Sequence, residues 1–316
     1  MKKKMIIAFF IVIMGILVLG KKYTNEKNIK RAYNITIDLN RGISLNNFFE
    51  KLNLNNVFFK IYLKIERDSG RKIKAGHYEF KGNYSYGDLL NILEEGREKY
   101  VSLTIPEGYT ILEIGELLEN KGYGNVKGLN EALKNIKDFP YLTPKGNFQG
   151  YLYPETYYFS GEITPEKVVK RMLKEFLIKF PPKDYPDKEI FYKQLIMASI
   201  LEREAQIATE KPIMASVFYN RLNKGMKLAS DATVNFAYDY KKKRMYYKDL
   251  KIDSPYNTYM YKGLPPGPIA NPDYESVMAA INPAKTKYLF FVATGGGHHT
   301  FTKTYREHLE VQKKKK

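Results

Sequence analysis

Sixteen consecutive apolar residues run from Met5 to Gly20, with Lys2–Lys4 before them and Lys21 and Lys22 after them. As a helix, this run would be about 24 Å long, and flanking lysine side chains can extend it towards the ~30 Å thickness of a hydrocarbon core. The run is either a retained membrane anchor or a cleaved secretory signal. We expect the anchor, because no small-residue cleavage site precedes Lys21. The charge before the run predicts a cytoplasmic N-terminus and a domain outside the cell membrane, which the chain crosses once.

The formal net charge of +18 is concentrated at the two ends of the chain. Residues 1–34 carry a net +7 and Lys313–Lys316 carry +4, so eleven of the eighteen charges lie in the tails. No nucleic-acid-binding motif accompanies them, and we expect no nucleic-acid partner. The chain contains no cysteine, which excludes disulfides, a thiol nucleophile and thiolate metal ligands.

Two strand–turn–helix patterns organise the N-terminal half. The first begins with the alternating strand Ile35–Leu39 and continues into an apolar helical stripe that ends at Leu52. The second begins at Leu103 and leads into a helix capped by Thr110. Between them we expect a helix over 56–67, a strand over 77–80 and a helix after Ser85. The predicted fold is therefore α+β.

The predicted division of the chain has five parts. Residues 1–22 form a cytoplasmic tip and transmembrane helix, 23–34 a linker, 35–100 a small α+β module, 101–312 a mixed α/β region, and 313–316 a basic tail. Within the fourth part, the segment Gly150–Phe159 is rich in aromatic residues without a helical period. Such rings either form a core or stack on the C–H faces of sugars, and we expect the core.

Two carboxylates lie close together on the helix predicted over Phe191–Ile207. Glu202 and Glu204 point about 200° apart around a helix, so they cannot share one environment. Apolar residues at positions 197, 200, 201 and 207 flank Glu204, whereas the neighbours of Glu202 are smaller and more polar. A carboxyl group among apolar side chains has a raised pKa and can act as an acid. The alternative is that Glu204 is a surface residue at the helix end, beside Arg203.

The loops that follow favour a cleft around Glu204, because they are rich in proline, glycine and polar residues. We expect no metal and no cofactor. His298 and His299 are adjacent and lack ligand spacing. The Gly295–Gly297 run lacks the remainder of a phosphate-binding motif and is interpreted as a turn.

Six segments in the same order resemble the endolytic murein transglycosylase (MltG, YceG-like) family. They are Ala198–Glu204, Val217–Leu222, Tyr256–Tyr259, Gly263–Pro266, Pro283–Thr286 and His299–Phe301. With the N-terminal anchor and strand–turn–helix modules, which are similar to the LysM-like region of the family, the resemblance covers nearly the whole chain. It implies that residues 101–312 are a lytic transglycosylase region with a helix-borne catalytic Glu, acting on the glycan strands of nascent peptidoglycan and terminating their elongation.

The resemblance also implies roles for particular residues. Glu204 corresponds to the catalytic acid, and the product would carry a 1,6-anhydro-N-acetylmuramic acid end. Ala205 replaces the Thr or Ser that often follows this acid, so a hydroxyl that would orient the carboxyl is missing. The alternative function is a non-catalytic scaffold that binds glycan and recruits peptidoglycan synthases. The candidates for positioning the sugar are Asn220, Asp231, Tyr256, Asn257, Tyr259 and His299.

Overall fold

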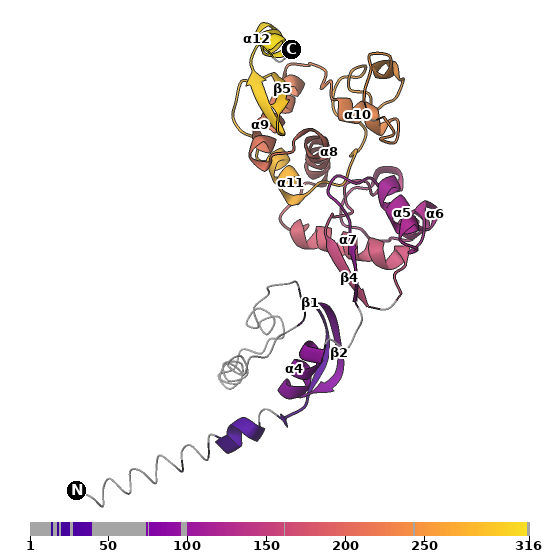
Figure 1. Ribbon diagram of the computed structural model, residues 1–316, viewed down its shortest axis with the longest axis vertical. Helices are drawn as coiled ribbons and strands as arrows, with labels where there is room; N and C mark the ends of the chain where they lie inside the picture. Colours follow the sequence, from indigo (N-terminus) through magenta and orange to yellow (C-terminus); the bar gives the residue numbers. More distant parts are fainter. Residues whose placement is uncertain are drawn as a thin grey trace, which may run out of the picture. The chain divides into compact units, whose positions relative to one another are not determined.

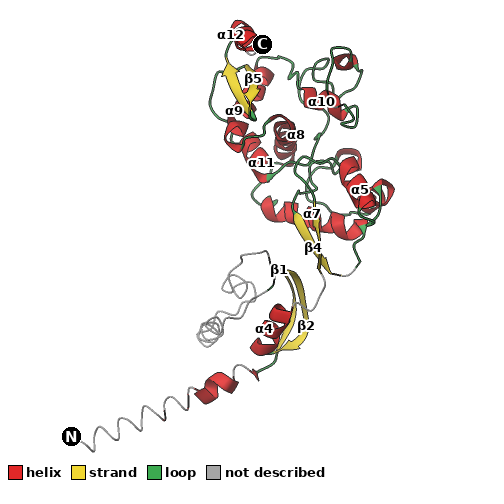
Figure 2. Ribbon diagram, in the orientation of Figure 1, coloured by secondary structure: helices red, strands yellow, loops and turns green. Residues whose placement is uncertain are grey.

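The computed structural model describes residues 14, 18, 20–25, 28–39, 74, 76–95, 100–160, 162–242 and 244–314 (Figure 1). Contacts between Cα atoms divide the chain into two compact units. One unit comprises Met1–Leu103 with Tyr158–Glu162, and the other comprises Thr104–Tyr157 with Ile163–Lys316. The described residues form helices and small two-stranded sheets, so the protein has the expected α+β fold (Figure 2).

The first unit contains a two-stranded antiparallel sheet and a helix. Strand β1 (Arg31–Leu39) pairs with β2 (Gly76–Tyr84), and α4 (Tyr86–Glu95) follows β2 directly. Apolar residues from all three elements form the core of this unit. The fully buried members are Ile37, Tyr78, Phe80, Tyr86, Leu89, Leu90 and Leu93.

The predicted linker over 23–34 is wrong at its C-terminal end, because β1 begins at Arg31. Residues 32, 34 and 36 are exposed, while Arg31, Tyr33 and Ile35 are partly buried on the other face of the strand. Tyr33 and Tyr84 have ring centroids 6.4 Å apart across the pair of strands. The alternation that predicted Ile35–Leu39 therefore extends four residues further towards the N-terminus, with an arginine and a tyrosine as its partly buried members.

The second unit is mainly helical. It contains the strands β5 (Phe290–Gly295) and β6 (His298–Thr302), which pair with each other. Strand β3 (Tyr100–Thr104) pairs with β4 (Thr156–Ser160), and most residues of these two strands belong to the first unit. Short 3₁₀ turns occupy Pro144–Gly146, Ala208–Glu210 and Asp249–Lys251. The α-helices are α5 (Ile111–Asn120), α6 (Val126–Lys134), α7 (Pro165–Lys179), α8 (Lys188–Glu204), α9 (Lys211–Asn223), α10 (Asp231–Phe236), α11 (Tyr274–Ile281) and α12 (Tyr305–Lys314).

Helix α8 lies at the centre of this unit, with α11 and α9 packed on it (Figure 1). Its residues from Leu195 to Leu201 are all buried, which explains why the helix shows little amphipathic period. The Asp187 side chain caps it by accepting from the backbone N–H of Ile190. The helix ends at Glu204, three residues earlier than predicted, because Ala205 adopts an extended conformation. The backbone conformation of Ala205 therefore places Glu204 in the last position of α8.

The aromatic segment 150–159 contributes to the core, as expected. Tyr151 is fully buried, and its ring lies 5.1 Å from Phe176 and 6.0 Å from Tyr141, centroid to centroid. Tyr141 in turn stacks on Phe191 of α8 at 4.7 Å. The rings join α7 and α8 and are not available as a sugar platform.

One buried asparagine fastens two loops beside α8. Asn271 Oδ1 accepts from the backbone N–H groups of Gly150 and Leu152 at 2.8 and 3.0 Å, and its Nδ2 donates to the Tyr109 carbonyl at 2.8 Å. Gly150 has a φ of 94°, and a Cβ at this position would lie 2.8 Å from Pro268. Only glycine satisfies both conditions. The turn that follows β3 is thereby held close to the end of α8.

The helix predicted up to Leu52, the helix over 56–67 and almost all of the Met5–Gly20 run lie outside the described residues. Within the part that is described, no helix has both the length and the apolar character needed to span a membrane. The predicted basic tail overlaps α12, which continues to Lys314. The predicted turn at Gly295–Gly297 is a tight hairpin turn, with positive φ at both Gly296 and Gly297.

Candidate active site

The Glu204 carboxyl is partly buried at the C-terminal end of α8. Burial raises its pKa above the usual value, and the nearby charge of Asp231 raises the pKa further. Hydrogen bonds from the Ser230 side chain and the Ala232 backbone, together with the proximity of His299, oppose this shift without reversing it. A carboxyl with a raised pKa remains protonated closer to neutral pH, where it can donate a proton.

Ser230 holds this carboxyl directly. Its Oγ donates to Glu204 Oε1 at 2.5 Å, and the residue is only 2% exposed. Ser230 occupies the N-cap position of α10, yet its side chain makes no capping hydrogen bond. Its backbone N–H donates to Thr258 Oγ1 at 3.1 Å, and its carbonyl accepts from Thr233 Oγ1 at 2.7 Å. The backbone is thus fixed by two threonines while the hydroxyl is directed at the acid.

Asp231 and Tyr259 form a second polar pair beside the acid. The Tyr259 hydroxyl donates to Asp231 Oδ1 at 2.6 Å. Burial raises the pKa of Tyr259 well above its ordinary value, and the hydrogen bond to Asp231 and the charge of Glu204 raise this pKa further. The phenol therefore stays neutral at physiological pH, and the pair presents one carboxylate and one ring next to Glu204.

His299 is held by another carboxylate. Its Nδ1 lies 2.8 Å from Glu210 Oε2, and its backbone N–H donates to Glu210 Oε1 at 3.2 Å. Burial opposes ionisation of Glu210, but hydrogen bonds from His299 and His298 outweigh it and lower the pKa of Glu210. His299 thus has a hydrogen-bond partner of its own and affects Glu204 through the electric field alone.

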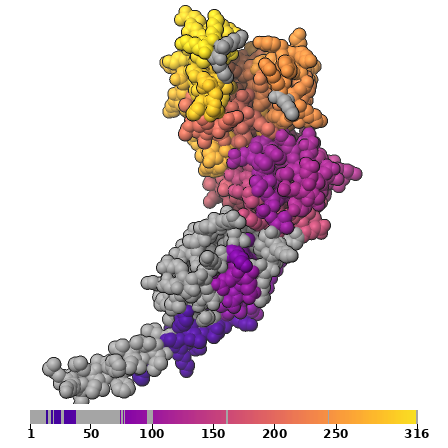
Figure 3. Space-filling view, viewed as in Figure 1, coloured from indigo at the N-terminus to yellow at the C-terminus, as the bar shows by residue number. Residues whose placement is uncertain are grey.

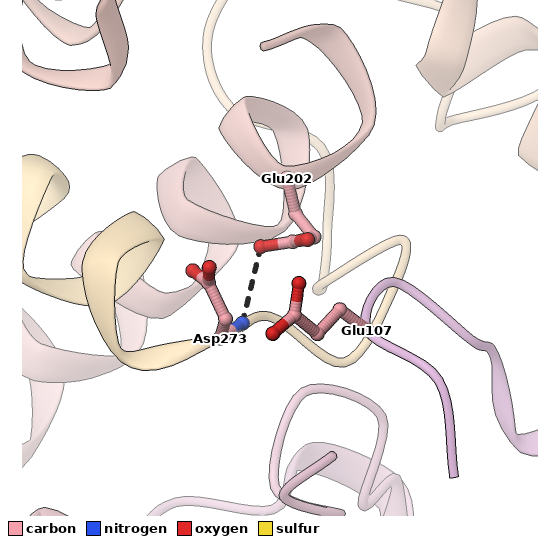
Figure 4. Close-up of side chains that lie close together, drawn as sticks. All are labelled: Glu107, Glu202 and Asp273. Atoms are coloured by element: carbon pink, nitrogen blue, oxygen red, sulfur yellow. Dashed lines mark hydrogen bonds between the residues drawn. The ribbon is translucent and has the colours of Figure 1, made fainter. Parts of the chain in front are cut away.

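Glu202 belongs to a different group of side chains, together with Asp273 and Glu107 (Figure 4). Its Oε2 accepts from Ser276 Oγ at 2.6 Å, from the Asp273 backbone N–H at 3.1 Å and from Lys211 Nζ at 3.4 Å. Lys211 Nζ also donates to Asp273 Oδ2 at 2.6 Å. The side chains of Glu202 and Lys211 are 7% and 6% exposed. Glu202 Oε2 therefore accepts all its hydrogen bonds from donors within the protein.

Glu107, from the turn after β3, brings a third carboxylate to this group. One carboxylate oxygen each from Glu107, Glu202 and Asp273 lie within 4.8 Å of one another. Burial and the charge of Asp273 raise the pKa values of Glu107 and Glu202, whereas Lys211 lowers them. Hydrogen bonding to Lys211 outweighs burial at Asp273 and lowers its pKa. The Lys211 ammonium already supplies a cation at this group, so we assign no metal to it.

The predicted sugar-positioning residues divide into two sets. Asp231, Tyr259 and His299 lie close enough to Glu204 to interact with it electrostatically. Asn220 and Asn257 use their side chains to hold loops. Asn220 Nδ2 donates to the carbonyls of Thr286 and Tyr288, both at 3.0 Å.

The fully buried Asn257 donates to the Leu250 and Ile252 carbonyls at 2.9 and 2.8 Å. Its Oδ1 accepts from the Tyr259 N–H at 3.0 Å, so it shapes the turn that carries Tyr259. Tyr256 packs on Phe236, with ring centroids 4.7 Å apart. No hydrogen bond or pKa effect joins Tyr256 to Glu204 among the described residues.

Sequence reasoning missed two residues of this site. The sequence analysis did not single out Ser230, and only the three-dimensional fold shows that its hydroxyl turns to Glu204. Arg221 donates to the carbonyls of Leu289 and Leu228, at 2.7 and 2.5 Å, and interacts electrostatically with Glu204. Burial lowers its pKa, and Tyr259 and Glu204 act in the opposite direction. The proximity of Ser230 to Asp231 in the sequence was the one available signal.

One carboxyl with a raised pKa, held by a hydroxyl at a helix end and surrounded by polar loops, has the arrangement of a general acid–base site. The chain belongs to the YceG-like family, which it matches over residues 37–314. It is 34% identical to the endolytic murein transglycosylase of Bacillus subtilis strain 168, over 96% of this chain and 91% of that protein.

A further relative is the endolytic murein transglycosylase of Streptococcus pneumoniae strain D39, which is 28% identical over 75% of this chain. That match covers 49% of the pneumococcal protein, so the similarity spans about half of its length. The fold is similar to a crystal structure of a YceG-like protein from Listeria monocytogenes, with a TM-score of 0.60 and 33% identity. The match covers 89% of this chain and all of that one.

Proposed function

We propose that this protein is an endolytic murein transglycosylase that cleaves the glycan strands of peptidoglycan, with Glu204 as its single acid and base. The observation that carries the proposal is the contrast between two carboxyls. Both carboxyls have a raised pKa, but Glu204 is partly buried and is held by the Ser230 side chain and the Ala232 backbone. Glu202 is bound to Lys211, Ser276 and the Asp273 backbone. The family and the names of the relatives support the substrate class.

The proposed reaction breaks the bond between N-acetylmuramic acid and N-acetylglucosamine. Protonated Glu204 donates its proton to the glycosidic oxygen as the bond to C1 of the muramic residue breaks. The resulting carboxylate then accepts the proton of the C6 hydroxyl of the same residue, whose oxygen bonds to C1. The product carries a 1,6-anhydro end, and Glu204 is again protonated.

This mechanism requires one carboxyl because the nucleophile belongs to the substrate. A glycoside hydrolase uses a second carboxylate as nucleophile or base. An internal hydroxyl held near C1 gains a large proximity advantage over water. Glu202 Oε2 accepts three hydrogen bonds within the protein, which supports a mechanism without Glu202.

Ser230 orients the Glu204 carboxyl, because its Oγ donates a short hydrogen bond to Oε1. The same bond compensates for Ala205, which offers no hydroxyl next to the acid. Ser230 is therefore a positioning residue, with its own backbone fixed by Thr233 and Thr258.

The proposal extends to the location of the enzyme. The Met5–Gly20 run, with its lysine flanks, supports a single membrane anchor with the N-terminus in the cytoplasm and the remaining chain outside, where peptidoglycan lies. The β1–β2–α4 module is proposed as a LysM-like glycan-binding element. Peptidoglycan synthases, which make nascent strands at the membrane, are the proposed protein partners.

Mass spectrometry of reaction products tests the function. The full-length protein is incubated with purified, un-crosslinked peptidoglycan beside its Glu204→Gln variant. We expect 1,6-anhydromuramyl ends from the parent and none from the variant. Reducing ends would instead identify a hydrolase and bring Glu202 back into consideration. A folded parent that binds glycan without cutting it would support the scaffold alternative.

A further inference from the structure

A cavity of about 410 Å³ lies away from Glu204, between α5, α6 and the end of α10. Its size falls in the range of small-ligand sites, roughly 300–1,000 Å³. In the space-filling view, the segment with α5 and α6 lies against the segment with α10 (Figure 3). The lining residues are Thr110, Ile111, Leu112, Val126, Asn130, Asn147, Gln149, Phe236 and Asp239.

Unpaired amide nitrogens distinguish this cavity. Gln149 is 4% exposed, and its Oε1 accepts from the Ile111 N–H at 2.9 Å, while its Nε2 is buried with no partner. Asn147 Oδ1 accepts from the Gln149 N–H at 2.9 Å. Within the described residues, Asn147 Nδ2 and the whole Asn130 side chain make no hydrogen bond. A buried donor without a partner is costly, so Gln149 Nε2 favours a ligand with an acceptor oxygen. Asn147 is partly buried and Asn130 is exposed at the rim, where both side chains can add hydrogen bonds to that ligand.

The other lining residues limit the chemistry of that ligand. The lining contains one carboxylate, Asp239, and no Lys or Arg, so it does not suit a phosphate or carboxylate. Three aliphatic side chains and the Phe236 ring offer apolar surface. An acetamido group needs donors for its carbonyl, an acceptor for its N–H and an apolar contact for its methyl group. Amides, a carboxylate and apolar side chains together meet all three needs.

Three contacts connect the cavity to the acid. Helix α10 follows Ser230, which contacts Glu204, and ends with Phe236 on the cavity, about 9 Å further along the helix axis. Arg203, the neighbour of Glu204, donates to Glu113 Oε2 at 2.7 Å.

The same Glu113 oxygen accepts from the backbone N–H of Thr110, which lines the cavity, at 2.8 Å. The Arg203 guanidinium also lies 3.8 Å from the centre of the Tyr240 ring, next to Asp239.

We infer that this cavity is a subsite for a neutral N-acetylated sugar, an N-acetylglucosamine residue of the strand that lies beyond the cleaved bond. The inference rests on the proposed function, because it assigns the cavity to the same glycan. It gives the enzyme a means of selecting where along a strand it cuts. A strand whose acetamido group occupies the cavity is held in one register relative to Glu204.

The binding test uses full-length Glu204→Gln protein, which does not turn over. The probes are N-acetylglucosamine tetramer and cellotetraose, which lacks acetamido groups. We expect measurable binding of the first by calorimetry and much weaker binding of the second. Asn130→Ala should weaken binding of the acetylated tetramer about fivefold, the effect of one hydrogen bond. Glu131→Ala, an exposed change on the same helix, should leave binding unchanged.

A second variant keeps the test decisive. Asn130→Trp places a large ring at the exposed rim of the cavity and should weaken the tetramer further, with an unchanged melting temperature. In active protein, both changes at 130 should alter the lengths of the fragments released from un-crosslinked peptidoglycan while the anhydro ends remain.

Equal tetramer affinity in the 130 and 131 variants, or equal affinity for both probes, would overturn the subsite. Absence of anhydro ends from the parent would instead reject the transglycosylase while leaving the binding result intact.

Discussion

Glu202 and Glu204 are two residues apart on α8, and their carboxyls lie in two different regions of the same unit. Around Glu202, three donors and the neighbouring Asp273 form a closed, nearly inaccessible ion-pair group. Around Glu204, a single serine side chain holds one oxygen, and the polar side chains of Asp231 and Tyr259 pair with each other. A carboxylate bound to several protein donors stabilises the fold, whereas one held by few partners beside polar side chains is available for chemistry.

Replacing Glu204 by Gln should produce the largest change. Loss of the transferable proton is expected to lower turnover by roughly 10²–10⁴-fold. The melting temperature should not fall, because burial already disfavours the charged form of Glu204. Turnover of purified peptidoglycan and thermal unfolding, measured on one preparation, provide the check. Turnover within tenfold of the parent would remove Glu204 from the chemistry.

The Lys211→Met variant tests the other region. Removing the ammonium leaves Glu202 and Asp273 buried without their cation, which is expected to cost about 3–5 kcal/mol of unfolding free energy. Denaturant unfolding measures this loss, with exposed Lys224→Met as the matched control. The folded fraction should retain cleavage activity. A variant as stable as the parent would contradict the structural assignment of this group.

Ser230→Ala should have a smaller effect with a diagnostic pH dependence. Loss of one hydrogen bond to the acid is expected to reduce the maximal rate about tenfold. The bond stabilises the carboxylate, so its removal raises the pKa of Glu204, and the protonated form persists to higher pH. The descending alkaline limb of the rate profile therefore moves to higher pH. A limb that stays in place or moves to lower pH would argue against the contact.

Tyr259→Phe should have the smallest effect of the series. The change removes the hydroxyl that donates to Asp231 and keeps the ring. We expect a two- to fivefold loss in kcat/KM, corresponding to about 1 kcal/mol or less. Steady-state kinetics on soluble glycan fragments measures it, with Tyr261→Phe as an exposed control that loses a similar bond to Asp253. A loss as large as that of Glu204→Gln would place Tyr259 in the reaction itself.

Local patterns predicted much of the fold. The Thr110 N-cap, the helix after Ser85 and the strand at Ile35–Leu39 are all present, because each depends on residues within one or two turns. The end of α8 was not predicted, because the apolar Ile207 suggested that the helix continues. The start of β1 at Arg31 was not predicted, because the partly buried side chains there are Arg31 and Tyr33. Neither is an aliphatic residue of the kind on which the alternating pattern was based.

The candidate site was less predictable from sequence because it depends on contacts distant along the chain. The opposite orientation of Glu202 and Glu204 follows from helix geometry alone and holds in the structure. The expected apolar surroundings of Glu204 were wrong in part. Its apolar helix neighbours are buried in the core, while its carboxyl meets Ser230 and the Ala232 backbone. Asn220 and Asn257 proved to support loops, a role that a motif cannot distinguish from sugar binding.

The end of α8 at Glu204 has an electrostatic consequence. Aligned peptide dipoles leave roughly half a negative charge at the C-terminal end of a helix, which destabilises a carboxylate placed there. The extended conformation of Ala205 therefore places the acid at the pole that opposes its ionisation. Had the helix continued to Ile207, that pole would lie nearly a turn away. The backbone angle of one alanine thus helps to keep a proton on the neighbouring glutamate.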